Sequence, residues 1–252
     1  SEASGAIGAA ARASLARAAE LERATRGLRG PERSRALELA ASAFDRLVAE
    51  LDAEPAAAAR AAWSAAELWR RHGSLALAEK DYLHAAAKDP ARYGQRALLC
   101  AADMQRRQQR TEDARATYVR AAAVDPRTGH AHDARLWLAR LLQTEQRLDN
   151  AIVAFQGALE SAPTPPAGIE TSDLLAKAWI AKGDLDAAAR AIEHAEDLVE
   201  AAGGGDPVDV ERLRRAADGM GARRALERAR DRQNGAGADA VRLDEQRRKD
   251  GE

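Results

Sequence analysis

Small and apolar side chains recur along the chain at the spacing of one face of an α-helix. Between Gly73 and Pro90 the anchors are Ala78, Tyr82 and Ala85. Positions i, i+4 and i+7 share a helix face, so the alanines would let a second helix approach while the ring fills the space left. Pro90 cannot continue a helix and marks its end. The pattern predicts a helix that packs through this stripe.

The same register returns three more times, and its leading alanines lie 36, 37 and 37 residues apart. A fixed period of about 20–50 residues is typical of stacked repeats, in which each unit buries its apolar face on its neighbours. The last copy lacks the proline. The three copies are Ala114, Tyr118, Ala121 and Pro126; Ala151, Phe155, Ala158 and Pro163; and Ala188, Ile192 and Ala195.

Further apolar stripes extend this pattern into pairs of helices. Helices are expected from about residue 7 to 26 and from Pro31 to about Leu51, and Pro55 opens the first clear repeat. The following repeats are expected over about 91–124, 131–162 and 169–202. Thr111 and Asp184 are the predicted N-caps of second helices in these repeats.

Four segments are therefore expected. Residues 1–54 form an N-terminal capping pair or a degenerate repeat, and residues 55–205 hold the four repeats. Residues 206–232 begin with Asp-Pro, which suits a helix start, and are predicted to cap the stack. Residues 233–252 are polar and interrupted by glycine, so disorder is expected there.

This register resembles the tetratricopeptide repeat (TPR), in which each unit pairs two helices. The resemblance covers roughly residues 55–203 and is most complete over Gly183 to Ala195, although the family's unit is about 34 residues long. It implies an all-α, right-handed superhelical solenoid of antiparallel helix pairs. Residues that match the first helix of the family's unit and the turn after it are Ala66, Trp69, Gly73, Ala102, Ala139, Ala176, Trp179 and Gly183.

The resemblance also implies a function, because the first helices of TPR units line a concave groove that holds a peptide or a partner helix. The matching positions would form a basic ladder with an acidic edge, which suits an acidic segment since arginine can bind carboxylates bidentately. An ordinary solvated helix face is the alternative. The family's carboxylate clamp is not expected. The groove positions carry Glu67, Arg70, Arg71, Asp103, Arg106, Arg107, Arg140 and Lys177.

Catalytic and metal-binding motifs are not apparent. The sequence has no glycine-rich phosphate loop after a strand and no serine-centred nucleophile elbow. His130 and His132 lack a third ligand at a recognisable spacing, and Cys100 is interpreted as a small core residue. We expect a non-catalytic protein with no cofactor, no metal and no small-molecule substrate, whose partner is another protein.

Charge and hydropathy limit the class of partner and the cellular compartment that we expect. The formal net charge is −1, which argues against a general nucleic-acid binder. No run approaches the roughly 20 apolar residues of a membrane span, so a soluble protein without membrane insertion is expected, with the cytoplasm favoured and export left open. Two alternative functions stand beside the scaffold: an assembly or regulatory module of a larger protein, and a nucleic-acid or transcription-associated module that uses the arginine-rich C-terminal tail.

Overall fold

The computed structural model describes residues 9–201 together with 215, 218, 219 and 221. The chain divides into two compact units, Ser1–Pro163 and Thr164–Glu252. The predicted capping helix at 206–232 lies largely, and the predicted tail at 233–252 entirely, outside the described residues.

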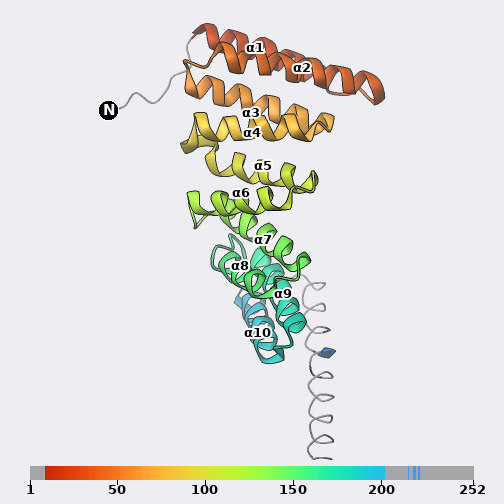
Figure 1. The fold of residues 1–252 in the computed structure, drawn as a ribbon, viewed down its shortest axis with the longest axis vertical. Coiled ribbons are helices and arrows are strands. Elements are labelled where there is room, and N and C mark those ends of the chain that lie inside the picture. Colours follow the sequence, from red (N-terminus) through yellow and green to blue (C-terminus); the bar gives the residue numbers. More distant parts are fainter. Residues whose placement is uncertain (1–8, 202–214, 216–217, 220, 222–252) are drawn as a thin grey trace, which may run out of the picture. The chain divides into compact units, whose positions relative to one another are not determined.

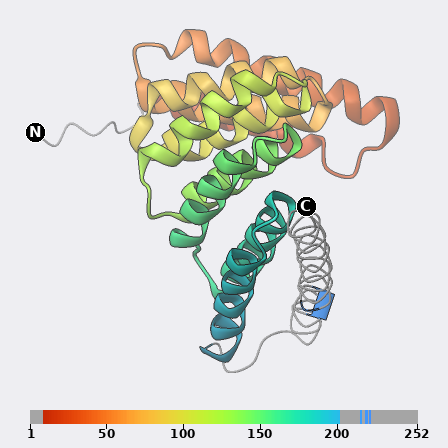
Figure 2. The ribbon, with the colours of Figure 1, turned by 60° about the horizontal axis from the view of Figure 1, so that its bottom comes forward.

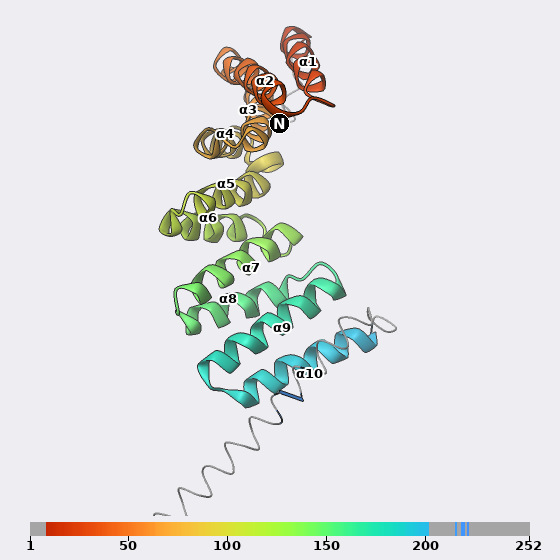
Figure 3. The same ribbon diagram turned by 90° about the vertical axis from the view of Figure 1, so that its right-hand side faces the viewer.

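The first unit is a stack of helices in which each packs on the next along the chain (Figure 1). Figure 3 shows successive helices running back and forth across this stack. A short π-helical turn, η1 (Pro90–Gly94), precedes α5. The helices are α1 (Ala9–Ala24), α2 (Gly30–Glu50), α3 (Pro55–His72), α4 (Leu75–Lys88), α5 (Gln95–Arg107), α6 (Thr111–Val124), α7 (Gly129–Thr144) and α8 (Leu148–Glu160).

The second unit contains α9 (Pro165–Lys182) and α10 (Leu185–Ala201). These two helices lie side by side and pack on each other (Figure 2). The chain turns between them at Gly183, which has φ 90° and so lies in the left-handed region that glycine adopts without strain. The structure confirms the predicted all-α architecture of consecutive helix pairs.

The predicted helix starts are partly confirmed. The Asp184 carboxylate accepts a hydrogen bond from the Ala187 backbone N–H at 2.8 Å, as expected of an N-cap. Thr111 was wrongly predicted as a cap: it lies inside the first turn of α6, and Arg110 occupies the cap position without a side-chain bond. The sequence interpretation missed the threonine caps of α7 and α9, Thr128 and Thr164.

The anchors that define the repeat form the core of the stack. Tyr82, Tyr118 and Phe155 are fully buried, and the alanines at both ends of each stripe are buried with them. Each ring fills the space left where alanines let two backbones approach, which keeps the interior close-packed. Ile192 occupies the equivalent position in the second unit and is 2% exposed.

A pair of carboxylates lies within the first unit, between α2 and α4. Asp81 is 1% exposed, and neither of its oxygens accepts a hydrogen bond from the described residues. Its neighbour Asp45 accepts a hydrogen bond from the indole N–H of Trp69 at 2.8 Å. Burial and the charge of Asp45 raise the pKa of Asp81 to about 7, against the weaker opposing effect of Lys80, whose Nζ lies 3.6 Å from Asp81 Oδ1.

The first prediction concerns the repeat anchor. Truncating the fully buried Tyr118 to alanine removes a ring from a close-packed interior, so the free energy of unfolding should fall by roughly 3–5 kcal/mol. Chemical denaturation followed by circular dichroism measures this. Leu39→Ala, at a side chain that is 58% exposed on α2, is the control and should change stability little. An equal effect of the two substitutions would contradict the packing described.

The second prediction concerns pH. Because the pKa of Asp81 is raised on folding, the folded chain binds more protons than the unfolded chain between about pH 4 and pH 7. The contribution of Asp81 to stability should therefore be present below about pH 4 and be lost as the pH rises through 7. In Asp81→Asn this loss should be absent. Unfolding curves of both proteins across this range test it, and parallel pH profiles would show that Asp81 does not titrate as described.

Candidate protein-binding surface

One face of the odd-numbered helices of the first unit carries most of the predicted groove residues. On α3 the spacing of Trp63, Glu67 and Arg70 places them on a single face, and the same holds for Arg96 and Asp103 on α5. The odd-numbered helices also contact each other directly, α1 with α3 and α5 with α7. We call this face the inner surface. Its residues are Glu22, Trp63, Glu67, Arg70, Arg71, Arg96, Asp103, Arg106, Arg107, Trp137 and Arg140.

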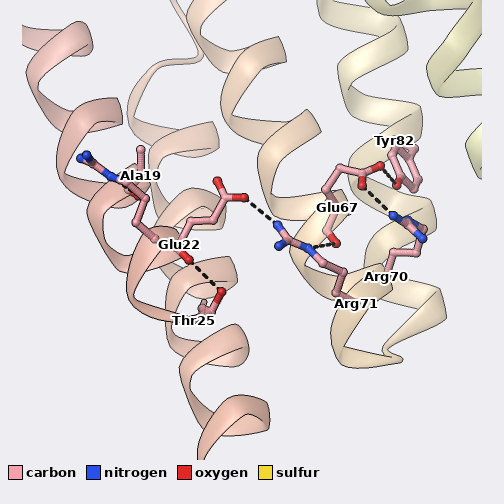
Figure 4. Close-up of polar contacts among 8 residues, drawn as sticks. Ala19, Glu22, Thr25, Glu67, Arg70, Arg71 and Tyr82 are labelled. Atoms are coloured by element: carbon pink, nitrogen blue, oxygen red, sulfur yellow. Dashed lines mark hydrogen bonds and ion pairs between the residues drawn. The ribbon is translucent and has the colours of Figure 1, made fainter. Parts of the chain in front are cut away.

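Arginine side chains connect neighbouring odd-numbered helices across the inner surface. Arg71 of α3 donates to the Glu22 carboxylate of α1 at 2.6 Å (Figure 4). The guanidinium of Arg96 lies 4.7 Å from the ring centre of Trp63, so it connects α5 to α3. Arg106 connects α5 to α7, because its guanidinium lies 4.5 Å from the ring centre of Trp137. Such cation–π contacts hold the guanidinium groups against the rings.

The Glu67 carboxylate is the centre of a hydrogen-bonded cluster within the first repeat. It accepts a bond from the Tyr82 hydroxyl at 2.5 Å and another from Arg70 at 2.8 Å (Figure 4). Burial raises the pKa of Glu67, but the bonds from Arg70 and Tyr82 outweigh it and leave the pKa below its ordinary value. Burial and the bond to Glu67 raise the pKa of Tyr82. The cluster therefore joins a core anchor to the inner surface through an ionised carboxylate.

The second repeat carries the same three residue types 36 positions later. Arg106 donates to Asp103 at 2.5 Å and also lies beside the buried Tyr118 hydroxyl, but that contact lacks the geometry of a hydrogen bond. In the third repeat the position of the acid is taken by Arg140, and the anchor is Phe155, which has no hydroxyl. Glu67 and Asp103 thus occur in the two repeats whose anchor ring carries a hydroxyl.

Ion pairs with carboxylates offset part of the positive charge of the predicted basic ladder. Arg70, Arg71 and Arg106 each contact a carboxylate, at 2.8, 2.6 and 2.5 Å. Lys177 lies in the second unit and pairs with the buried Asp173 at 2.8 Å. Arg107 is exposed and has no carboxylate partner within the described part of the chain. The acids therefore lie against the arginines of the ladder rather than along one edge of it.

Aromatic side chains are the functional candidates that sequence reasoning missed. Trp63 is partly exposed and stacks on Tyr93 at 5.6 Å between ring centres, and Arg92 lies 5.6 Å from the ring centre of Tyr93. Arg140 covers Trp137 at 5.1 Å from its own helix. A signal was present in the sequence, because a cation three residues after a tryptophan occurs both here and at Trp179, which Lys182 covers at 5.2 Å.

Catalytic or metal chemistry has little support among the described residues. No group of three or more histidine, cysteine or acidic side chains is close enough there to hold a metal ion. His132 is buried, and its Nδ1 lies 2.9 Å from the carbonyl oxygen of Ala158. Cys100 packs against the core, and burial raises the pKa of its thiol to about 11, which disfavours a nucleophilic thiolate. None of the described helices is long and apolar enough to cross a bilayer.

Solved structures identify the fold. The chain is similar to BtubC (BKLC) from P. vanneervenii (TM-score 0.54, 16% identity, 78% of this chain and 92% of the other). It is similar to MamA 41-end from Desulfovibrio magneticus RS-1 (TM-score 0.54, 16% identity, 78% of this chain and 98% of the other). It is also similar to YrrB, a TPR protein with an unusual peptide-binding site (TM-score 0.53, 16% identity, 81% of this chain and 90% of the other). The fold is TPR-like, as the sequence predicted. No protein-family model and no curated protein sequence matches the chain.

The third prediction separates the two tyrosine anchors. Tyr82→Phe removes a hydrogen bond to an ionised carboxylate, so it should lower the free energy of unfolding by about 1.5–3 kcal/mol. Tyr118→Phe removes a buried hydroxyl that makes no hydrogen bond, so it should be nearly neutral or slightly stabilising. Denaturant unfolding of both variants measures the difference. Equal losses would show that the Glu67 cluster contributes nothing specific.

Proposed function

We propose that the chain is a non-catalytic protein-interaction scaffold whose inner surface binds an acidic segment of another protein. The observation that carries this proposal is that guanidinium groups lie over the rings of two partly exposed tryptophans. Arg96 covers Trp63, while Arg106 and Arg140 both cover Trp137. An arginine stacked on a ring keeps the N–H groups at the edge of its plane available, and these match the geometry of a carboxylate.

The arginines of the inner surface would have two different roles. Arg71, paired with Glu22, connects α3 to α1, whereas Arg70 and Arg106 pair with acids of their own helices. All three would offer their remaining N–H groups. Arg96, which lies over a ring, and Arg107, which is exposed, bring charge that no carboxylate contact accounts for in the described residues. The proposed contact residues of the first unit remain those predicted: Glu67, Arg70, Arg71, Asp103, Arg106, Arg107 and Arg140. The predicted Lys177 belongs to the second unit and is not part of this surface.

The similarity to YrrB supports a role in binding, because YrrB is a TPR protein with an unusual peptide-binding site. At 16% identity the similarity concerns the fold, and a fold hosts more than one function. The proposal for this chain therefore depends on its own arginines and rings. A module that binds a neighbouring domain of the same larger protein would use the same surface and the same chemistry.

The fourth prediction tests this surface with a fluorescent glutamate-rich peptide and a matched glutamine-rich peptide as the uncharged reference. Replacing Arg96, Arg107 and Arg140 together by glutamine should weaken binding of the glutamate peptide about tenfold or more. The reason is that each exposed ion pair contributes only ~0–1 kcal/mol, and about 1.4 kcal/mol corresponds to a factor of ten. Fluorescence anisotropy measures the dissociation constants, and binding should also weaken with added salt.

The matched control replaces three exposed arginines of α2, Arg33, Arg35 and Arg46, by glutamine. It changes the net charge by the same amount on a helix outside the inner surface. Equal losses in the two triple variants would mean that only overall charge matters. Unchanged affinity in the inner variant would reject the inner surface as the binding site.

A further inference from the structure

A second candidate surface lies on the opposite layer of the first unit. There α6, α7 and α8 enclose an open groove of about 740 Å³. Its lining includes Arg135, Leu138 and Leu142 of α7, Val119 of α6 and Val153 of α8. At about 100° per residue, these three residues of α7 point away from Trp137 and Arg140. The groove is therefore separate from the inner surface.

The groove lining exposes aliphatic side chains of a kind that is normally buried. Val119 is 51% exposed and Val153 is 67% exposed, and Val124, which lies outside the lining at the end of α6, is 50% exposed. Few other large apolar side chains in the described part of the chain are as open. An apolar hollow flanked by exposed aliphatic groups is typical of a surface that receives a partner.

The sequence differs here from the preceding junction of the stack. Between α4 and α6, Glu79 accepts hydrogen bonds from Gln105, Gln108 and Arg110, so polar side chains bridge that junction. The groove junction keeps a polar bridge of its own, because Arg115 of α6 donates to the Glu145 carboxylate at 3.0 Å. Its lining differs in one position, where Leu142 replaces Gln105 one repeat later, so the groove itself is more apolar. Gly157 leaves the wall of α8 without a side chain, and a Cβ there would lie 3.4 Å from Cδ of Arg135. The glycine therefore leaves room for the Arg135 side chain to pack against α8 at the edge of the groove.

The shape of the lining fits a helix. Ala122, Ala123, Ala154 and Gly157 are small, so they let another backbone approach, as the anchor alanines do within the stack. A helix that presents aliphatic side chains at i, i+3 or i+4, and i+7 would fill the hollow, which is the usual way an amphipathic helix binds a groove.

The charge of the lining selects the kind of helix. Arg135 is the one charged residue among those that line the groove. Its Nη1 donates to the carbonyl oxygens of Pro126 at 2.8 Å and Gly157 at 3.2 Å, and to the Ser161 hydroxyl at 2.8 Å, all of which are neutral. Asp125 and Glu160 lie outside the lining, at the ends of α6 and α8. A carboxylate on the partner would complement the Arg135 charge.

We infer that this groove, defined by Val119, Arg135, Leu138, Leu142, Val153 and Gly157, binds an amphipathic helix of a partner protein. The helix carries an aliphatic stripe with an acidic residue beside it. A second copy of the same groove is a poor occupant, because a two-fold interface would bring Arg135 against its own symmetry mate. The inference goes beyond the proposed function and concerns a different face of the protein.

The test uses the full chain, labelled with ¹⁵N, and two synthetic helical peptides. Both have a leucine stripe, and they differ in carrying either glutamate or lysine beside it. The glutamate peptide should shift the backbone amide signals of Val119, Val153 and Gly157, and the lysine peptide should bind about tenfold more weakly. Testing charge on the peptide avoids replacing Arg135, which bonds to the backbone of two helix ends.

Val153→Asp should weaken binding of the glutamate peptide at least about tenfold while circular dichroism stays unchanged, because this side chain is mostly exposed. Leu39→Asp on α2, whose side chain is 58% exposed, is the matched control and should bind the peptide as the unchanged chain does. The triple glutamine variant at Arg96, Arg107 and Arg140 should also bind it normally, which separates this site from the inner surface.

Three results would overturn the inference: equal binding of the two peptides, unchanged binding in Val153→Asp, or shifts confined to other helices. Sedimentation equilibrium of the chain alone provides a further test. Self-association that Val153→Asp abolishes would assign the groove to a second copy instead of a partner helix.

Discussion

The close approach of helix backbones at the alanine stripes is the constraint on which the rest of the first unit depends. Because the alanines on either side of Tyr82, Tyr118 and Phe155 are buried, each ring is enclosed between helices and fixes their spacing. That spacing brings the odd-numbered helices close enough for arginines to reach across them. The contacts of Arg71 with Glu22 and of Arg106 with Trp137 follow from it. A larger residue at an anchor alanine would push the packed helices apart, and the residues of the inner surface would move apart with them.

Much of this fold could be predicted from the sequence because the signals are periodic. The anchors and the proline and glycine breaks repeat at a fixed distance, so each copy supports the others. Helix caps depend on a single residue, and there the prediction was less successful. Asp184 was predicted correctly, whereas Thr111 begins α6 one residue too late to cap it. Thr128 caps α7 in a connection where the period gave no guide.

The candidate site was less predictable than the fold. Its residues could be recognised in the sequence, but several of the side chains that they contact could not. The resemblance to the repeat family placed Arg70, Arg106 and Arg140 on the inner faces of three helices, and the acids that pair with Arg70 and Arg106 lie only three residues away. The partner of Arg71 is distant in the chain, because Arg71 contacts Glu22, 49 residues apart. At the groove between α6, α7 and α8, Arg135 packs close to Gly157, where no side chain stands in its way. A sequence search for functional residues does not find a contact of this kind.

The four tryptophans provide the most direct measurement of the central claim, that the inner surface binds an acidic partner. Their indole N–H signals can be followed by NMR while a glutamate-rich peptide is added. Trp63 and Trp137 lie beneath arginines of the inner surface, whereas Trp69 is buried and donates to Asp45. We expect the signals of Trp63 and Trp137 to shift with saturation while that of Trp69 stays in place. Saturable binding that leaves Trp63 and Trp137 unchanged would contradict it.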